Sequence, residues 1–171
     1  MNVVLKRAYE FERKGLEFYI DSASKSSNAL VKRTIFSLAK EEITHMMKID
    51  EIALFLDASG KWIGEETGFK GSDIEIEIKE FFEKTNKEIL DANKDNTDLI
   101  KKAMEFEKKS YELYDDLSKK AGSDIEKSFY DELKKQEENH FDALQNVDYY
   151  LTETGDWFEK DESNVWSWMN S

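Results

Sequence analysis

Four glutamates of this chain stand at positions where an amphipathic helix carries apolar side chains. Leu5, Ala8 and Leu16, for example, recur at the three- and four-residue steps of a buried helix face, and a glutamate interrupts that series. The four are Glu12, Glu42, Glu107 and Glu137. Burying one bare carboxylate costs several kcal/mol, and neither lysine nor arginine occupies these positions, so the pattern requires cations from elsewhere.

Each of the two histidines of the chain stands three residues after one of these glutamates. Three residues turn a helix by about 300°, so Glu42 and His45 project from one face, as do Glu137 and His140. Two Glu-x-x-His pairs, with one further Glu from each of two other helices, form the ligand set of di-iron and di-manganese bundles. We therefore expect two metal ions, iron first and manganese or zinc as alternatives. The predicted ligands are Glu12, Glu42, His45, Glu107, Glu137 and His140.

The two halves of the chain are related. Residues 7–56 aligned with residues 102–151, at a constant offset of 95 and without gaps, give 15 identities in 50 positions. The offset carries the first ligand set onto the second, and each half separates its two glutamates by 30 residues. A lone Glu-x-x-His pair arises by chance on a solvated helix face, but two copies with matched spacing favour metal binding.

The pattern predicts one domain over residues 1–171, an all-α antiparallel four-helix bundle. Apolar periodicity indicates a helical hairpin at 1–57 with a turn at Ser26–Asn28, and a second hairpin at 98–153 with a turn at Ala121–Asp124. A long crossover at 58–97 contains most of the glycines, and 78–92 within it could form a short helix. The aromatic tail, 154–171, is expected to cover a bundle face or a subunit contact.

Composition excludes several classes of function. The chain has no cysteine, which excludes disulfides, zinc fingers and thiol nucleophiles. A net charge of −13 disfavours nucleic acid as a partner. The N-terminus lacks an apolar signal core and no stretch reaches membrane-spanning length, so we expect a soluble, cytoplasmic protein with no membrane partner.

Six other glutamates are predicted to lie off the apolar face, on the solvated surface of the helices: Glu10, Glu17, Glu41, Glu105, Glu112 and Glu138. Tyr19 and Tyr114 each follow a predicted ligand by seven residues, on the ligand face. Their hydroxyls are candidates for hydrogen bonds to the ligand carboxylates, and core packing accounts for them equally well. Gly15 and Ser110 follow the same glutamates by one turn, and their small size would leave space for the metal cluster.

At these residues the chain resembles the rubrerythrin group of the ferritin-like superfamily. The similarity covers both hairpins and rests on the segments AYEFERKGLEFY, EEITH, AMEFEKKSYELY and EENH. It implies a ferritin-like bundle that binds two iron ions, reduces hydrogen peroxide or handles dioxygen, and assembles as a homodimer or larger oligomer.

The chain departs from that group in two ways. Familiar rubrerythrins carry a cysteine-rich rubredoxin domain, so here the electrons would come from a separate protein. They also carry a glutamate where this chain has Ser110, which makes the site more symmetric and closer to plain ferritin-like or manganese-catalase-like proteins. Two alternatives to a peroxidase stay open: a ferroxidase that binds or stores iron, and an interaction module whose metals only stabilise the fold.

Overall fold

The chain folds into long helices in the computed structural model, which describes residues 2–62, 74, 76–78, 80 and 94–154. The helices are α1 (Val3–Lys25), α2 (Ala29–Ser59), α4 (Lys94–Lys119) and α5 (Asp124–Tyr149), and α5 continues into a π-helical turn at Tyr150–Thr154. Strands are absent from these ranges. The all-α prediction is therefore confirmed, and no helix in the described ranges combines the length and apolarity needed to cross a membrane.

The helices begin and end at residues whose side chains satisfy free backbone groups. The Asn28 Oδ1 accepts the backbone N–H of Val31 at 3.1 Å, and the Ser123 Oγ accepts that of Glu126 at 3.2 Å. These caps start α2 and α5 at the two predicted turns. Gly60 ends α2 with a φ of 69°, a left-handed conformation that glycine adopts without a steric penalty.

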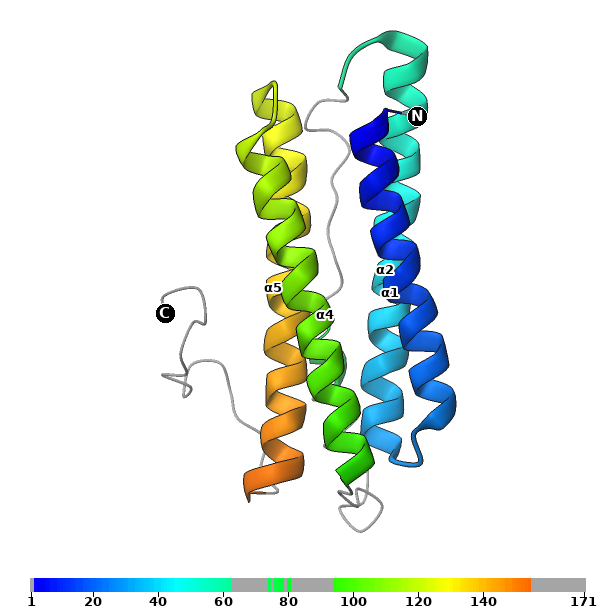
Figure 1. Cartoon of the computed structure of the whole chain (residues 1–171), viewed down its shortest axis with the longest axis vertical. Helices are drawn as coiled ribbons and strands as arrows, with labels where there is room; N and C mark the ends of the chain where they lie inside the picture. Colours follow the sequence, from blue (N-terminus) through cyan, green and yellow to red (C-terminus); the bar gives the residue numbers. More distant parts are fainter. Residues whose placement is uncertain (1, 63–73, 75, 79, 81–93, 155–171) are drawn as a thin grey trace.

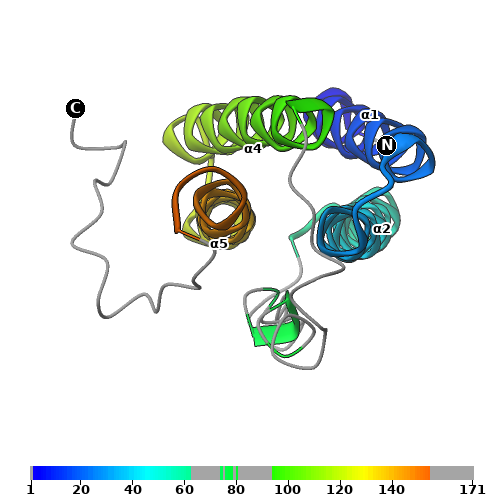
Figure 2. The ribbon, with the colours of Figure 1, turned by 90° about the horizontal axis from the view of Figure 1, so that it is seen from below.

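The four helices form two hairpins that lie side by side. Helix α1 packs along α2, and α4 packs along α5, while contacts of α1 with α4 and of α2 with α5 join the hairpins. Figure 2, viewed along the bundle, shows the four helices at the corners of a quadrilateral. In Figure 1, α2 ends at one end of the bundle and α4 begins at the other, so the connecting chain must span its length.

The crossover is shorter than predicted. Helix α2 continues to Ser59 and α4 already begins at Lys94, so the expected bounds of 58 and 97 were wrong by a few residues. Ile74, residues 76–78 and Glu80 are helical, and Ile74 and Ile78 are buried against the bundle. Most of the expected helix at 78–92, and the aromatic tail after residue 154, lie outside the described residues.

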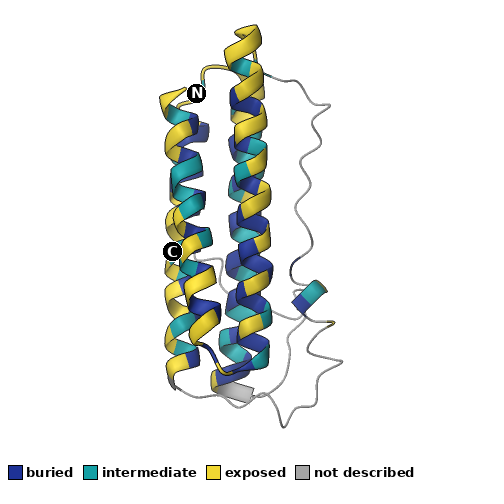
Figure 3. Ribbon diagram, turned by 90° about the vertical axis from the view of Figure 1, so that its right-hand side faces the viewer, coloured by how far each residue is buried: buried dark blue, intermediate teal, exposed yellow. Residues whose placement is uncertain are grey.

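The core consists of two apolar clusters with a polar layer between them. One cluster includes Ile35, Leu38 and Leu144, and the other includes Leu5 and Leu133. On each of the four helices, the predicted metal ligands fall between residues of the first cluster and residues of the second. Figure 3 shows buried and exposed residues alternating along the helices. The fold thus places the ionisable residues near the middle of the bundle, with apolar side chains on both sides.

The crossover offers a matched pair of substitutions for testing whether it is part of the core. Ile78 is fully buried whereas Ile76 is 55% exposed. Ile78→Ala should lower the free energy of unfolding by about 2–5 kcal/mol, because it opens a cavity against α2, and Ile76→Ala should change it by about 0.5 kcal/mol or less. Urea denaturation followed by circular dichroism measures both. Equal effects of the two variants would show that the crossover does not contribute to the core.

Candidate metal centre

The bundle brings all six predicted ligands together in its interior. Helix α1 supplies Glu12, α2 supplies Glu42 and His45, α4 supplies Glu107, and α5 supplies the remaining pair, Glu137 and His140. The five residues other than His140 are 0% exposed, and His140 is 2% exposed. Each hairpin therefore contributes two carboxylates and one imidazole to a site that solvent does not reach.

The ligand atoms form two groups, one from each hairpin. Within the group of Glu12, Glu42 and His45, and within that of Glu107, Glu137 and His140, one ligand atom per residue lies within 4.8 Å of the others. The imidazole rings of the two groups are stacked, with centroids 5.5 Å apart and planes inclined by 15°. Each group offers two oxygens and one nitrogen, and the described residues could thus hold two metal ions.

The carboxylate of Glu137 joins the two groups. Its Oε1 lies 3.2 Å from the Nδ1 of His45, and its Oε2 lies 3.5 Å from the Nδ1 of His140. The Nδ1 of His45 is also 3.1 Å from the Oε2 of Glu12, and that of His140 is 3.6 Å from the Oε2 of Glu107. Both imidazoles thus turn the same nitrogen toward the carboxylates, and Glu137 has one oxygen near each imidazole.

Several of these buried atoms lie close to charged neighbours but form no hydrogen bond of suitable geometry. Both carboxylate oxygens of Glu42 and of Glu137, the Oε2 of Glu107 and the Nδ1 of His140 are unpaired in this sense. A buried carboxylate without hydrogen bonds is costly, and proteins tolerate it where a cation neutralises the charge. Two divalent ions would neutralise the four carboxylates, and the donor set of carboxylate oxygen and imidazole nitrogen suits iron, manganese or zinc.

Two tyrosines tie the hairpins together at the site. The hydroxyl of Tyr19 on α1 donates to Glu107 on α4, and the hydroxyl of Tyr114 on α4 donates to Glu12 on α1. Burial, and then the charge of the accepting carboxylate, raise the pKa of both phenols well above the usual range. Both hydroxyls therefore stay protonated and orient a carboxylate of the opposite hairpin.

Gln136 is a site residue that the sequence did not single out. It is buried on α5, and its Oε1 lies 2.9 Å from the Nε2 of His45. An amide oxygen only accepts, so the Nε2 of His45 carries the proton and the Nδ1 is left to face the carboxylates. The amide nitrogen of Gln136 in turn donates to Glu132 at 3.2 Å.

The expectation of a solvated Glu41 was wrong. Its side chain is only 5% exposed, and one of its oxygens lies within 4.8 Å of a ring nitrogen of both His45 and His140. Glu41 precedes His45 by four residues and so shares its face of α2. Because α2 packs against α1, α5 and the crossover, its buried face is wider than the narrow stripe of ligands.

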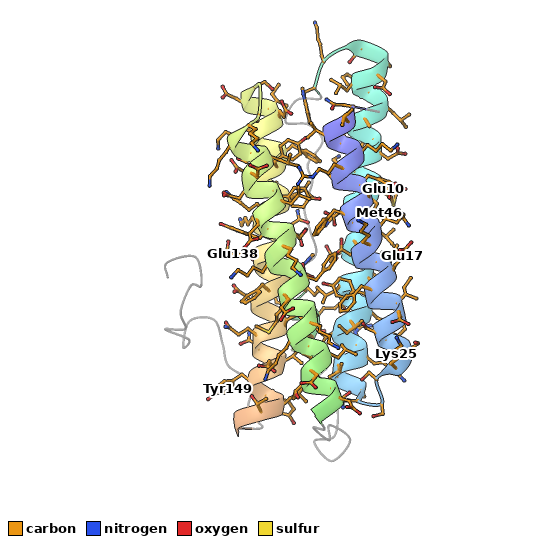
Figure 4. The ribbon with its side chains drawn as sticks, in the orientation of Figure 1. Glu10, Glu17, Lys25, Met46, Glu138 and Tyr149 are labelled. Carbon is orange, nitrogen blue, oxygen red and sulfur yellow. The ribbon has the colours of Figure 1, made fainter. Side chains whose placement is uncertain are left out.

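The other acidic residues set aside as solvated behave largely as predicted. Glu17, Glu105 and Glu112 are exposed, and Glu10 and Glu138 are half-buried. Glu10 and Glu17 lie on the outer side of α1, where both bond to Arg13 (Figure 4). These residues take no part in the site.

In the metal-free protein, protons supply the positive charge. Burial raises the pKa of Glu107 to about 8, in spite of the opposing charge of His140. Burial alone would lower the pKa of His140, but the carboxylates of Glu107 and Glu137 raise it to about 9. Burial and then the charge of Glu12 raise the pKa of Glu42 well above its usual range. Burial would likewise raise the pKa of Glu137, yet the two imidazoles lower it.

Comparisons of the chain with protein-family models, with curated proteins and with solved structures give no match. The support for the candidate metal centre is therefore the geometry of its residues.

Gly15 provides a test of the packing around the site. A Cβ at this position would lie 2.7 Å from the Cε1 of Phe106 and 2.9 Å from the Oε1 of Glu42. Gly15→Ala should therefore displace Glu42 and destabilise the protein by about 1–3 kcal/mol, although alanine normally favours a helix. The metal affinity of this variant, measured by calorimetric titration, should also be lower than that of the parent protein.

The matched control is Ser110→Ala, at the position of the second hairpin that corresponds to Gly15. The Oγ of Ser110 is buried without a hydrogen-bond partner, so its removal should change the free energy of unfolding by about 0.5 kcal/mol or less. A Gly15→Ala variant as stable as Ser110→Ala would contradict the close approach of Gly15 to Glu42.

The stability of the metal-free protein should fall as pH rises from about 5 to 9. Glu107 titrates at 4.5 when unfolded and at about 8 when folded, and His140 at 6.5 and about 9. Across this range the folded state keeps protons that the unfolded state has already lost. A rise in pH therefore favours the unfolded state. The lowered pKa of Glu137 acts below pH 4.5.

Urea melts in the presence of a chelator, at intervals between pH 5 and 9, measure this dependence. Glu107→Gln removes one of the titrating groups and should flatten the curve. Stability that is constant or rises over this range in the parent protein would contradict the assigned protonation.

Proposed function

We propose that this chain is a ferritin-like, non-haem di-iron oxidoreductase that reduces hydrogen peroxide with electrons from a separate donor protein. The observation that carries the proposal is the pair of buried groups, each of two carboxylates and one imidazole, that Glu137 joins. The antiparallel hairpins and the connection along the bundle are consistent with a ferritin-like arrangement.

The six ligands would be Glu12, Glu42 and His45 on one side, and Glu107, Glu137 and His140 on the other. When bound, two ferrous ions would supply the two electrons that peroxide needs, and would act as Lewis acids. Reduction of one hydrogen peroxide also consumes two protons and yields two waters. The oxidised site would then take two electrons from the external donor.

Residues of the chain hold this site in one arrangement. Tyr19 and Tyr114 each fix a carboxylate of the opposite hairpin, and Gln136 fixes the proton on the Nε2 of His45. The apolar clusters on both sides of the polar layer exclude bulk water, which strengthens the attraction between carboxylates and cations. Tyr19 and Tyr114 are thus positioning residues.

A ferroxidase that binds or stores iron is the second candidate. The observation in its favour is Ser110, which stands on α4 where rubrerythrins carry an additional glutamate. Its hydroxyl is buried and lacks a hydrogen-bond partner. Without that carboxylate the site is nearly symmetric between the hairpins, as in plain ferritin-like proteins. Iron storage would further require a large hollow assembly, which particle size reveals.

Metal loading followed by rapid mixing tests the proposal. Protein reconstituted anaerobically with Fe(II) should hold about two ions per chain. Glu42→Ala/Glu137→Ala should lose them, whereas Glu105→Ala/Glu112→Ala, which removes two exposed carboxylates of α4, should keep them. Stopped-flow mixing of the ferrous protein should then show faster oxidation by hydrogen peroxide than by dioxygen.

Each alternative gives its own result. Faster oxidation by dioxygen, with particles the size of a shell, would favour the ferroxidase. Two ions that stabilise the fold but react with neither oxidant would favour the interaction module. Manganese or zinc bound in preference to iron would identify a different centre, and the absence of stoichiometric metal would overturn the proposal.

A further inference from the structure

Helix α2 exposes a row of large apolar side chains on the face opposite the metal ligands. Phe36, Ile43, Met47 and Leu54 are 51%, 45%, 68% and 66% exposed. Scattered single apolar residues are normal on a protein surface, but several on the same face of one helix mark an interaction site. Figure 3 shows exposed residues along the length of α2.

The row has the spacing of a coiled-coil seam. Together with Lys40 and Asp50, both exposed, these residues occupy positions 36, 40, 43, 47, 50 and 54, with alternating steps of four and three. Such a seam keeps facing a straight partner helix, and at 1.5 Å per residue it is about 27 Å long. We call these six residues the α2 seam.

The α2 seam is complementary to a second copy of itself that runs in the opposite direction. About a midpoint at residue 45, Phe36 exchanges with Leu54, Ile43 with Met47, and the lysine at 40 with the aspartate at 50. A twofold axis through this midpoint therefore pairs apolar with apolar side chains and lysine with aspartate. Parallel helices would instead place lysine against lysine and aspartate against aspartate.

We infer that the α2 seam is the interface through which two copies of this chain associate, with their α2 helices antiparallel. The net charge of −13 on each chain opposes association, so apolar contact must drive it while Lys40 and Asp50 set its direction. Lys40 also lies 3.1 Å from Glu77 of its own crossover, which holds its ammonium beside the seam. A substitution of Asp50 is therefore the clearer test of the charge pairing.

Sedimentation velocity of the purified full chain at micromolar concentrations tests this inference. The parent chain should be a dimer. Asp50→Lys places like charges in two layers and should raise the dissociation constant at least tenfold, and Lys40→Asp should do the same. An equal mixture of these two variants should dimerise again, because each layer then pairs a lysine with an aspartate.

Two further variants separate the interface from general effects. Ile43→Glu, at an exposed position beside the axis, should sediment as a monomer. Circular dichroism should show that this monomer is folded. Glu112→Lys, on the exposed face of α4, makes the same charge change as Asp50→Lys and should leave the dimer intact. A monomeric parent chain, a dimer that survives Ile43→Glu, or failure of the mixed variants to associate would overturn the inference without affecting the metal centre.

Discussion

The burial of four carboxylates and two imidazoles in one layer of the bundle is the constraint on which the rest of the structure depends. Two apolar clusters enclose this layer, so water cannot screen its charges. Neighbouring features follow from it. Gly15 leaves room for the carboxylate of Glu42, and two tyrosine hydroxyls donate to carboxylates of the opposite hairpin. Without cations, only protons can reduce the repulsion. Burial raises the pKa of Glu107, and the carboxylates of Glu107 and Glu137 raise that of His140 in spite of its burial.

The repeat of one hairpin in the other gives the site an approximate twofold symmetry, and the differences between the copies break it. Tyr19 and Tyr114 are equivalent, and each binds a glutamate of the opposite copy. Glu41 and Gln136 are also equivalent by position, yet one is an acid and the other an amide. The layer therefore has an additional carboxylate on the α2 side and a neutral acceptor for His45 on the α5 side.

The sequence predicted which glutamates and histidines meet inside the bundle better than it predicted their surroundings, for a physical reason. A glutamate inside a narrow apolar stripe is conspicuous, and the matched spacing in both halves brought His45 and His140 to the same layer. The position of Glu41 depends on how many neighbours α2 packs against, which periodicity along one helix does not reveal. Gln136 acts through a hydrogen bond between two helices far apart in sequence. The crossover bounds failed because proline is absent and charged residues such as Lys94 continue a helix as readily as they end it.

Helix α2 links the inner site and the outer seam through one geometric relation. Two residues turn a helix by about 200°, so His45 points into the bundle while Ile43 and Met47 on either side of it point outward. The midpoint of the seam coincides with this histidine. In an antiparallel pair of α2 helices, the two candidate metal centres would consequently lie at the same height, on opposite sides of the interface. The apolar contacts that hold two copies together would then be formed by the same helical turns that position His45.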